Sequence, residues 1–82
     1  MPSATPEEIA AEARQVRRLQ LMMALVMNVI RQNDGMTVEE ASELVASARR
    51  AALHLFPGKE LAYDLIYRPR FQRLMAEKYR LH

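Results

Sequence analysis

The 82-residue sequence has no cysteine, no tryptophan and only two glycines and two histidines. The absence of cysteine excludes disulfides and thiolate zinc sites, which commonly reinforce small domains. Two isolated glycines, Gly35 and Gly58, cannot form a glycine-rich phosphate loop. A chain of this length buries only about 60 to 65% of its unfolded surface, so we expect stability to depend on close helix packing or on association.

Residues suited to catalysis are equally scarce. A nucleophilic serine needs a positioned base, yet the only histidines are His54, near the end of a predicted helix, and His82, at the C-terminus. No histidine lies at ligand spacing beside the carboxylate pairs of the chain. We therefore expect no catalytic residues, no metal ligands and no cofactor, and we predict that the protein is not an enzyme.

The longest hydrophobic run, residues 19–30 (LQLMMALVMNVI), is too short to cross a membrane. Its length as a helix is about 18 Å, whereas the hydrocarbon core of a bilayer is about 30 Å thick. The N-terminal residues are acidic and rich in alanine, without the basic start and apolar run of a secretory signal. We therefore expect a cytoplasmic protein that does not bind membranes.

The first helix is predicted over residues 6–32. Thr5 can cap this helix, Pro6 suits the first helical position, and Glu8 completes a T-x-x-E capping box. Apolar residues then recur along one face at the spacing of a heptad seam: Ile9, Val16, Leu19, Met23, Val26 and Ile30. The pattern predicts that other helices pack along this seam.

The opposite face of the same helix is polar at both ends and apolar in the middle. Leu21 and Leu25 lie there one turn apart, beside Asn28. Packing along the seam alone would leave both leucines in water. We therefore expect this second patch to contact a partner subunit or the C-terminal helix, and we predict a symmetric homodimer with the first helix near its centre.

The second helix is predicted over residues 38–55, antiparallel to the first. Residues 33–35 end the first helix, with Gly35 expected in the left-handed conformation, and Thr37 with Glu40 forms a second capping box. One stripe of the second helix is rich in alanine, which permits close approach of the helix axes. The short connection makes the two helices a hairpin.

The C-terminal part combines aromatic and basic residues. Helical segments are predicted over 59–67 and 69–80, either broken or bent at Pro69. Tyr63, Tyr67 and Phe71 are spaced by four residues. The basic residues follow or interleave with them: Arg68, Arg70, Arg73, Lys78 and Arg80. With Glu77 these give residues 68–82 a net charge of +4, five basic residues less one acid, whereas residues 1–67 sum to −2.

The aromatic residues of this segment have three possible interpretations. The aromatic residues can belong to the core, to a protein interface in which Tyr and Arg are anchors, or to a surface that stacks on single-stranded nucleic acid. Because large side chains must cover the first helix, we prefer the core or interface interpretation. A nucleic-acid-binding protein that uses the C-terminal basic residues is the alternative.

The sequence thus predicts one all-α domain over residues 1–82, with residues 1–4 disordered. A long N-terminal helix in an antiparallel hairpin and a Pro-kinked C-terminal helix are expected to assemble as a dimeric helical bundle. We predict a homo-oligomerising protein–protein interaction module, which forms a homodimer and can bind another protein. The candidate interface residues are Leu21, Leu25, Asn28, Tyr63, Tyr67 and Phe71.

Overall fold

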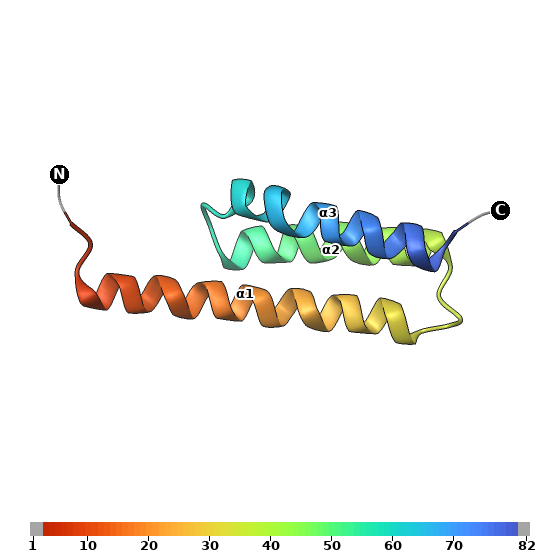
Figure 1. Cartoon of the computed structure of the whole chain (residues 1–82), viewed down its shortest axis with the longest axis horizontal. Helices are drawn as coiled ribbons and strands as arrows, with labels where there is room; N and C mark the ends of the chain where they lie inside the picture. The colour runs from red at the N-terminus through yellow and green to blue at the C-terminus, as the bar shows by residue number, and fades with distance from the viewer. Residues whose placement is uncertain (1–2, 81–82) are drawn as a thin grey trace.

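The computed structural model describes residues 3–80, and the protein is all-α, as the sequence predicted. Its helices are α1 (Pro6–Gln32), α2 (Val38–Leu55) and α3 (Glu60–Lys78), with no strand among residues 3–80. They lie side by side, and α2 runs antiparallel to α1 and α3 (Figure 1). The segment expected to be disordered, residues 1–4, falls partly on residues 1 and 2, which lie outside the described range.

Side-chain caps fix the starts of α1 and α2. The hydroxyl of Thr5 accepts a hydrogen bond from the amide of Glu8 at 3.1 Å. The hydroxyl of Thr37 accepts from the amide of Glu40 at 3.1 Å, and the Glu40 carboxylate accepts from the amide of Thr37 at 3.2 Å. These bonds satisfy amides that the start of a helix leaves without partners. Both helices therefore begin where the sequence predicts, with a complete capping box at Thr37 and the Thr5 half of the predicted box at the start of α1.

The core lies where the three helices meet. It consists of buried apolar residues: Leu19, Met23, Met27, Ile30, Ala41, Ala48, Ala52, Phe56, Tyr63, Tyr67, Phe71 and Leu74. The small alanine side chains bring α2 close to its neighbours. Of the predicted seam, Leu19, Met23 and Ile30 are buried and Val26 packs against the core from a half-buried position.

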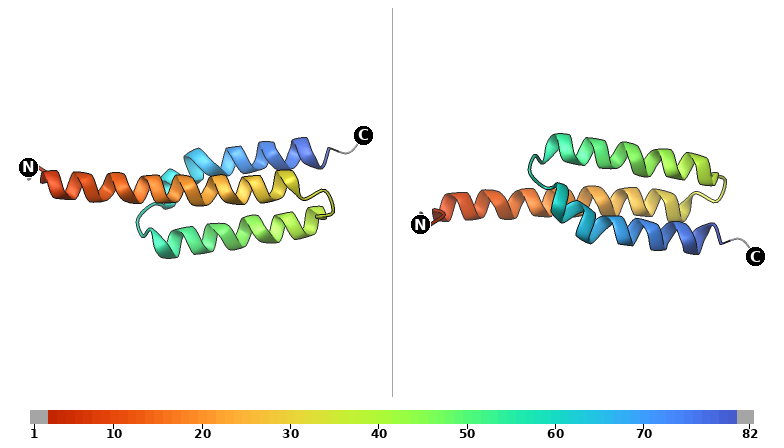
Figure 2. Two further views of the ribbon diagram at one scale, coloured as in Figure 1. Left: turned by 90° about the horizontal axis from the view of Figure 1, so that it is seen from below. Right: turned by 90° about the horizontal axis from the view of Figure 1, so that it is seen from above.

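The N-terminal part of the predicted seam is not packed. Ile9 and Val16 are 59% and 38% exposed, and every residue from 3 to 18 is exposed. The reason is length, because α1 has 27 residues whereas α2 has 18 and α3 has 19. Residues 6–18 are here called the arm, and the first turns of the arm extend past the other helices at the end where α2 joins α3 (Figure 2). Glu12 of the arm pairs with Lys59, which precedes α3.

The end of α1 differs from the expected glycine-based cap. Gly58 is the only residue with a positive φ, 82°, among residues 3–80, so the left-handed conformation expected at Gly35 is wrong. The ammonium group of Lys78 instead donates to the carbonyl oxygens of Ile30 and Asn33, the latter at 2.8 Å. A cation from α3 thus satisfies carbonyl groups that a left-handed glycine would otherwise help to satisfy.

Pro69 lies inside α3, which continues as one helix from residue 60 to 78 rather than as two segments. Proline lacks the amide that would bond to the carbonyl of Leu65. Both residues are exposed, so water can reach this carbonyl group and the helix continues without a buried unsatisfied acceptor. Within residues 3–80, every helix falls short of the combined length and apolar character that a bilayer crossing requires.

Candidate protein-interaction surfaces

The outer face of α1 is defined by Leu21, Leu25, Asn28 and Val29. It points away from the core, because these residues lie on the opposite side of the helix from Met23 and Ile30. Leu21 is 67%, Leu25 66% and Val29 48% exposed, and Asn28 is also exposed. The sequence predicted that Leu21 and Leu25 contact either a partner subunit or the C-terminal helix. Their exposure shows that α3 does not cover them.

The aromatic residues of α3 are core residues. Tyr63, Tyr67 and Phe71 are 2%, 6% and 2% exposed, and the ring centroids of the two tyrosines are 5.7 Å apart. The six residues predicted for an interface therefore belong to two different places. Leu21, Leu25 and Asn28 face solvent, whereas the aromatic rings hold the three helices together.

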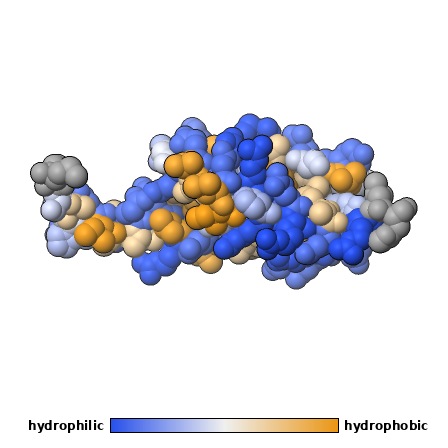
Figure 3. All heavy atoms as spheres, turned by 45° about the horizontal axis from the view of Figure 1, so that its top comes forward, coloured by the Kyte–Doolittle hydropathy of each residue, from blue (hydrophilic) through white to orange (hydrophobic). Residues whose placement is uncertain are grey.

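A second exposed apolar surface covers the first turns of α3. Leu61 and Leu65, one helical turn apart, are 71% and 68% exposed, and Ile66 is 45% exposed. Figure 3 shows hydrophobic side chains gathered at this end of the bundle and further ones along the arm. Sequence periodicity missed this surface because apolar residues occur on all sides of the first half of α3.

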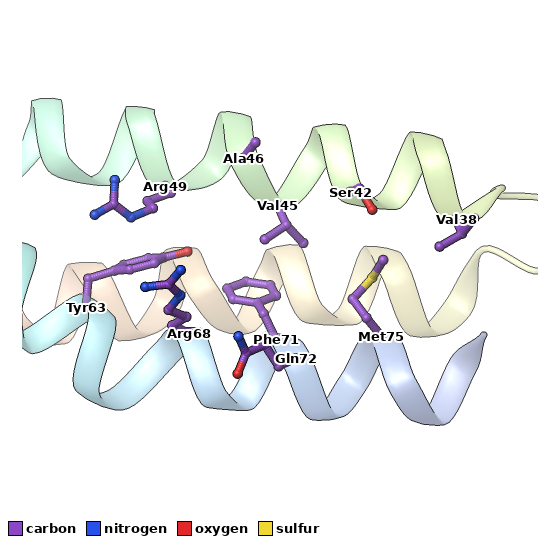
Figure 4. A pocket seen from close by; sticks show the side chains of 10 residues that line it. All are labelled: Val38, Ser42, Val45, Ala46, Arg49, Tyr63, Arg68, Phe71, Gln72 and Met75. Atoms are coloured by element: carbon purple, nitrogen blue, oxygen red, sulfur yellow. The ribbon is translucent and has the colours of Figure 1, made fainter. Parts of the chain in front are cut away.

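A groove of about 750 Å³ lies between α2 and α3. It is lined by Val38, Ser42, Val45, Ala46 and Arg49 from α2, and by Tyr63, Arg68, Phe71, Gln72 and Met75 from α3. Side chains from the two helices point toward one another, and α1 passes behind them (Figure 4). We call it the α2–α3 groove. The sequence contained a signal for it, because Val38, Ser42, Val45 and Arg49 recur at helical spacing beside the alanine stripe.

Arg49 joins the two walls of the α2–α3 groove. Its Nε and Nη2 atoms each donate to a carboxylate oxygen of Asp64 at 3.2 Å, and its guanidinium group lies 5.7 Å from the centre of the Tyr63 ring. The hydrogen bond to Asp64 raises the pKa of Arg49. Burial raises the pKa of Tyr63, against the opposing effect of the Arg49 charge. Since both pKa values move farther above neutrality, Arg49 is charged and Tyr63 is neutral at neutral pH.

The hydroxyl of Tyr63 is buried and has no hydrogen-bond partner within residues 3–80. A buried hydroxyl without a partner is destabilising by about 1 to 3 kcal/mol. Tyr63→Phe is therefore expected to leave the free energy of unfolding unchanged or to raise it by up to about 1 kcal/mol. Urea denaturation measures this, and Tyr79→Phe is the matched control: the Tyr79 hydroxyl donates to the Met36 carbonyl at 2.9 Å, so its loss should be destabilising. An equal loss of unfolding free energy in both variants would contradict the conclusion that the Tyr63 hydroxyl has no hydrogen-bond partner.

The C-terminal basic residues point in different directions. Lys78 donates hydrogen bonds to carbonyl groups at the end of α1, and Arg68 lines the α2–α3 groove. Arg70 lies 5.8 Å from the ring centre of Tyr67, and both Arg70 and Arg73 line a smaller hollow of about 240 Å³ between α1 and α3. Arg80 follows α3 and is exposed. These residues do not form one continuous basic face with the aromatic rings.

The described part of the chain contains no group of three or more His, Asp or Glu side chains that could hold a metal ion. Comparison with protein-family models, with curated proteins and with solved structures returned no match.

Proposed function

We propose that this protein is a homo-oligomerising protein–protein interaction module whose basic unit is a dimer. The observation that carries the proposal is the amount of apolar side chain in contact with solvent. Among residues 3–80, ten large hydrophobic residues are 38 to 71% exposed, whereas the core contains twelve buried residues. Small domains bury a modest share of their surface, and association is a common way to bury more.

The exposed residues are grouped rather than scattered, which strengthens the proposal. Leu21, Leu25 and Val29 follow one another at intervals of one turn on α1, and Leu61 and Leu65 do so on α3. Single exposed leucines are normal on soluble proteins, whereas contiguous apolar rows mark interaction sites. The groove between α2 and α3 adds an apolar concave surface.

The alternative function, binding of nucleic acid through the C-terminal basic residues, has less support. Stacking on bases requires accessible aromatic rings, and Tyr63, Tyr67 and Phe71 are buried. The ammonium group of Lys78 is held by backbone carbonyl groups. Binding of labelled RNA or DNA that weakens with salt and is lost in an Arg70→Ala, Arg73→Ala double variant would favour the alternative.

Light scattering coupled to size-exclusion chromatography tests self-association. The expected mass at micromolar concentration is about 19 kDa, twice the 9.5 kDa of one chain. Because folding is then linked to association, the thermal midpoint should rise with protein concentration. A mass of 9.5 kDa together with a midpoint independent of concentration would contradict the proposal.

A further inference from the structure

The arm of α1 is a helix that lacks a neighbour. α1 exceeds α2 by nine residues, 27 against 18, which is about 13 Å of helix. Ile9 and Val16 lie at heptad spacing on the same face as Met23 and Ile30, yet they are 59% and 38% exposed. The arm therefore continues the apolar stripe of α1 beyond the helices that cover the rest of this stripe.

The α2–α3 groove provides a surface that suits such a stripe. It lies on the side of α2 and α3 that faces away from α1 (Figure 4). Leu61 and Leu65 are exposed on α3 at the end of the bundle nearest the arm. Arg68 lines the groove one turn farther on, and no carboxylate lies within ion-pair distance of it among residues 3–80. The surface thus combines exposed leucines with an uncompensated positive charge.

We infer that the arm of one chain packs against the α2–α3 groove and the adjoining Leu61 and Leu65 of a second copy, and that the reciprocal contact forms at the same time. This arrangement rests on the self-association proposed above. The two copies are related by a twofold axis perpendicular to the long axis of the molecule. This axis places α2 and α3 of the second copy on the arm of the first copy, in line with α2 and α3 of the first copy. Each α2–α3 pair is then enclosed between its own α1 and the arm of the other copy.

The charges of the arm favour an orientation in which the tip of the arm points along the α2–α3 groove of the second copy, toward Arg68. Glu7 and Glu8 lie at its tip, and docking tip-first brings Glu8 toward Arg68 of the second copy. Glu12 pairs with Lys59 of its own chain, so it anchors the base of the arm rather than its tip. Opposite charges across an interface fix the register and speed association.

The outer face of α1 is a poorer contact for a second copy. Residues 13–33 contain four arginines and no acidic residue: Arg14, Arg17, Arg18 and Arg31. An antiparallel pairing of two outer faces around Leu21 and Leu25 would bring these arginines from both helices together without a carboxylate between them. Like charges placed together in an interface disfavour association, so the arm is the better candidate for self-contact.

Cysteine cross-linking tests the contact directly, because the chain has no cysteine of its own. Ile9→Cys and Leu61→Cys are made as separate full-length variants, mixed and oxidised mildly. Mixing ensures that a bond between the two positions joins different chains. The expected product is a covalent heterodimer, identified by mass spectrometry, in clear excess over that formed by a Leu25→Cys and Leu61→Cys mixture.

Other outcomes separate this arrangement from self-association itself. If the wild-type protein has the mass of a dimer but the Ile9 and Leu61 positions do not cross-link, or Leu25→Cys cross-links with itself instead, then the arm contact is wrong and self-association stands. If the wild-type protein is a monomer, both are wrong.

Charge reversal gives an independent measurement. Glu8→Arg and Arg68→Glu are each expected to weaken association about tenfold, equivalent to ~1.4 kcal/mol, as measured by analytical ultracentrifugation. An equimolar mixture of the two variants should recover much of this loss, because both reciprocal contacts of the mixed dimer then join opposite charges. Both side chains are exposed, so the variants are expected to fold. Absence of recovery in the mixture would overturn the pairing.

Discussion

Replacing Phe71 with alanine is expected to lower the free energy of unfolding by about 3 to 5 kcal/mol. Phe71 is 2% exposed and belongs to the cluster in which α3 packs against the other two helices. Its removal would take away the burial of an aromatic ring and leave a cavity, since helices joined by short links cannot fully close the space. For a small domain with a total stability near 5 kcal/mol, such a loss leaves a large unfolded fraction at room temperature.

Urea denaturation followed by circular dichroism measures this change. Leu25→Ala is the matched control, because it removes a large apolar side chain that is 66% exposed. It should change the free energy of unfolding by no more than about 0.5 kcal/mol. Equal effects of the two substitutions would mean that the aromatic residues of α3 do not form the core.

Enlarging an alanine of α2 is expected to have the next largest effect. Ala52 is fully buried, at 0% exposed, where α2 meets the core. A leucine there would have to push the helices apart or adopt a strained rotamer, so Ala52→Leu should be destabilising by about 1 to 3 kcal/mol. The thermal midpoint and the urea midpoint should both fall.

Its neighbour provides the control for that substitution. Ala51 is exposed on the same helix, so Ala51→Leu adds the same atoms in solvent. Alanine and leucine are both strong helix formers, and a change within about 0.5 kcal/mol is expected. A large loss in Ala51→Leu would show that leucine disturbs the helix itself rather than the packing at Ala52.

The parts of the fold that depend on neighbouring residues could be predicted from the sequence. Thr5 and Thr37 begin their helices with hydrogen bonds between residues three positions apart, so the caps are visible as short motifs. The buried alanines of α2 follow from their helical spacing. The exposed arm was not predicted, because Ile9 and Val16 continue the heptad seam and were expected to pack, although they are 59% and 38% exposed.

Features that depend on how α3 lies on the hairpin could not be predicted. The first half of α3 carries apolar residues on every side, with Leu61 and Leu65 exposed and Tyr63 and Tyr67 buried. Helical periodicity does not distinguish these two faces, because both are apolar. The α2 wall of the α2–α3 groove has a signal in the sequence, but its α3 wall becomes visible only when the helices are placed in three dimensions. The same holds for the separation of Leu21 and Leu25 from the aromatic residues.

The hydrogen bonds of Lys78 and Tyr79 have a consequence for how the protein opens. They join α3 to Asn33 and Met36, residues 45 and 43 positions away, at the link between α1 and α2. A link between adjacent helices is commonly a site of local fraying, yet this one is held by a remote part of the chain. The link and the last turn of α3 should therefore open together. Slow amide exchange at this end of the bundle would then report the cooperative unfolding of all three helices.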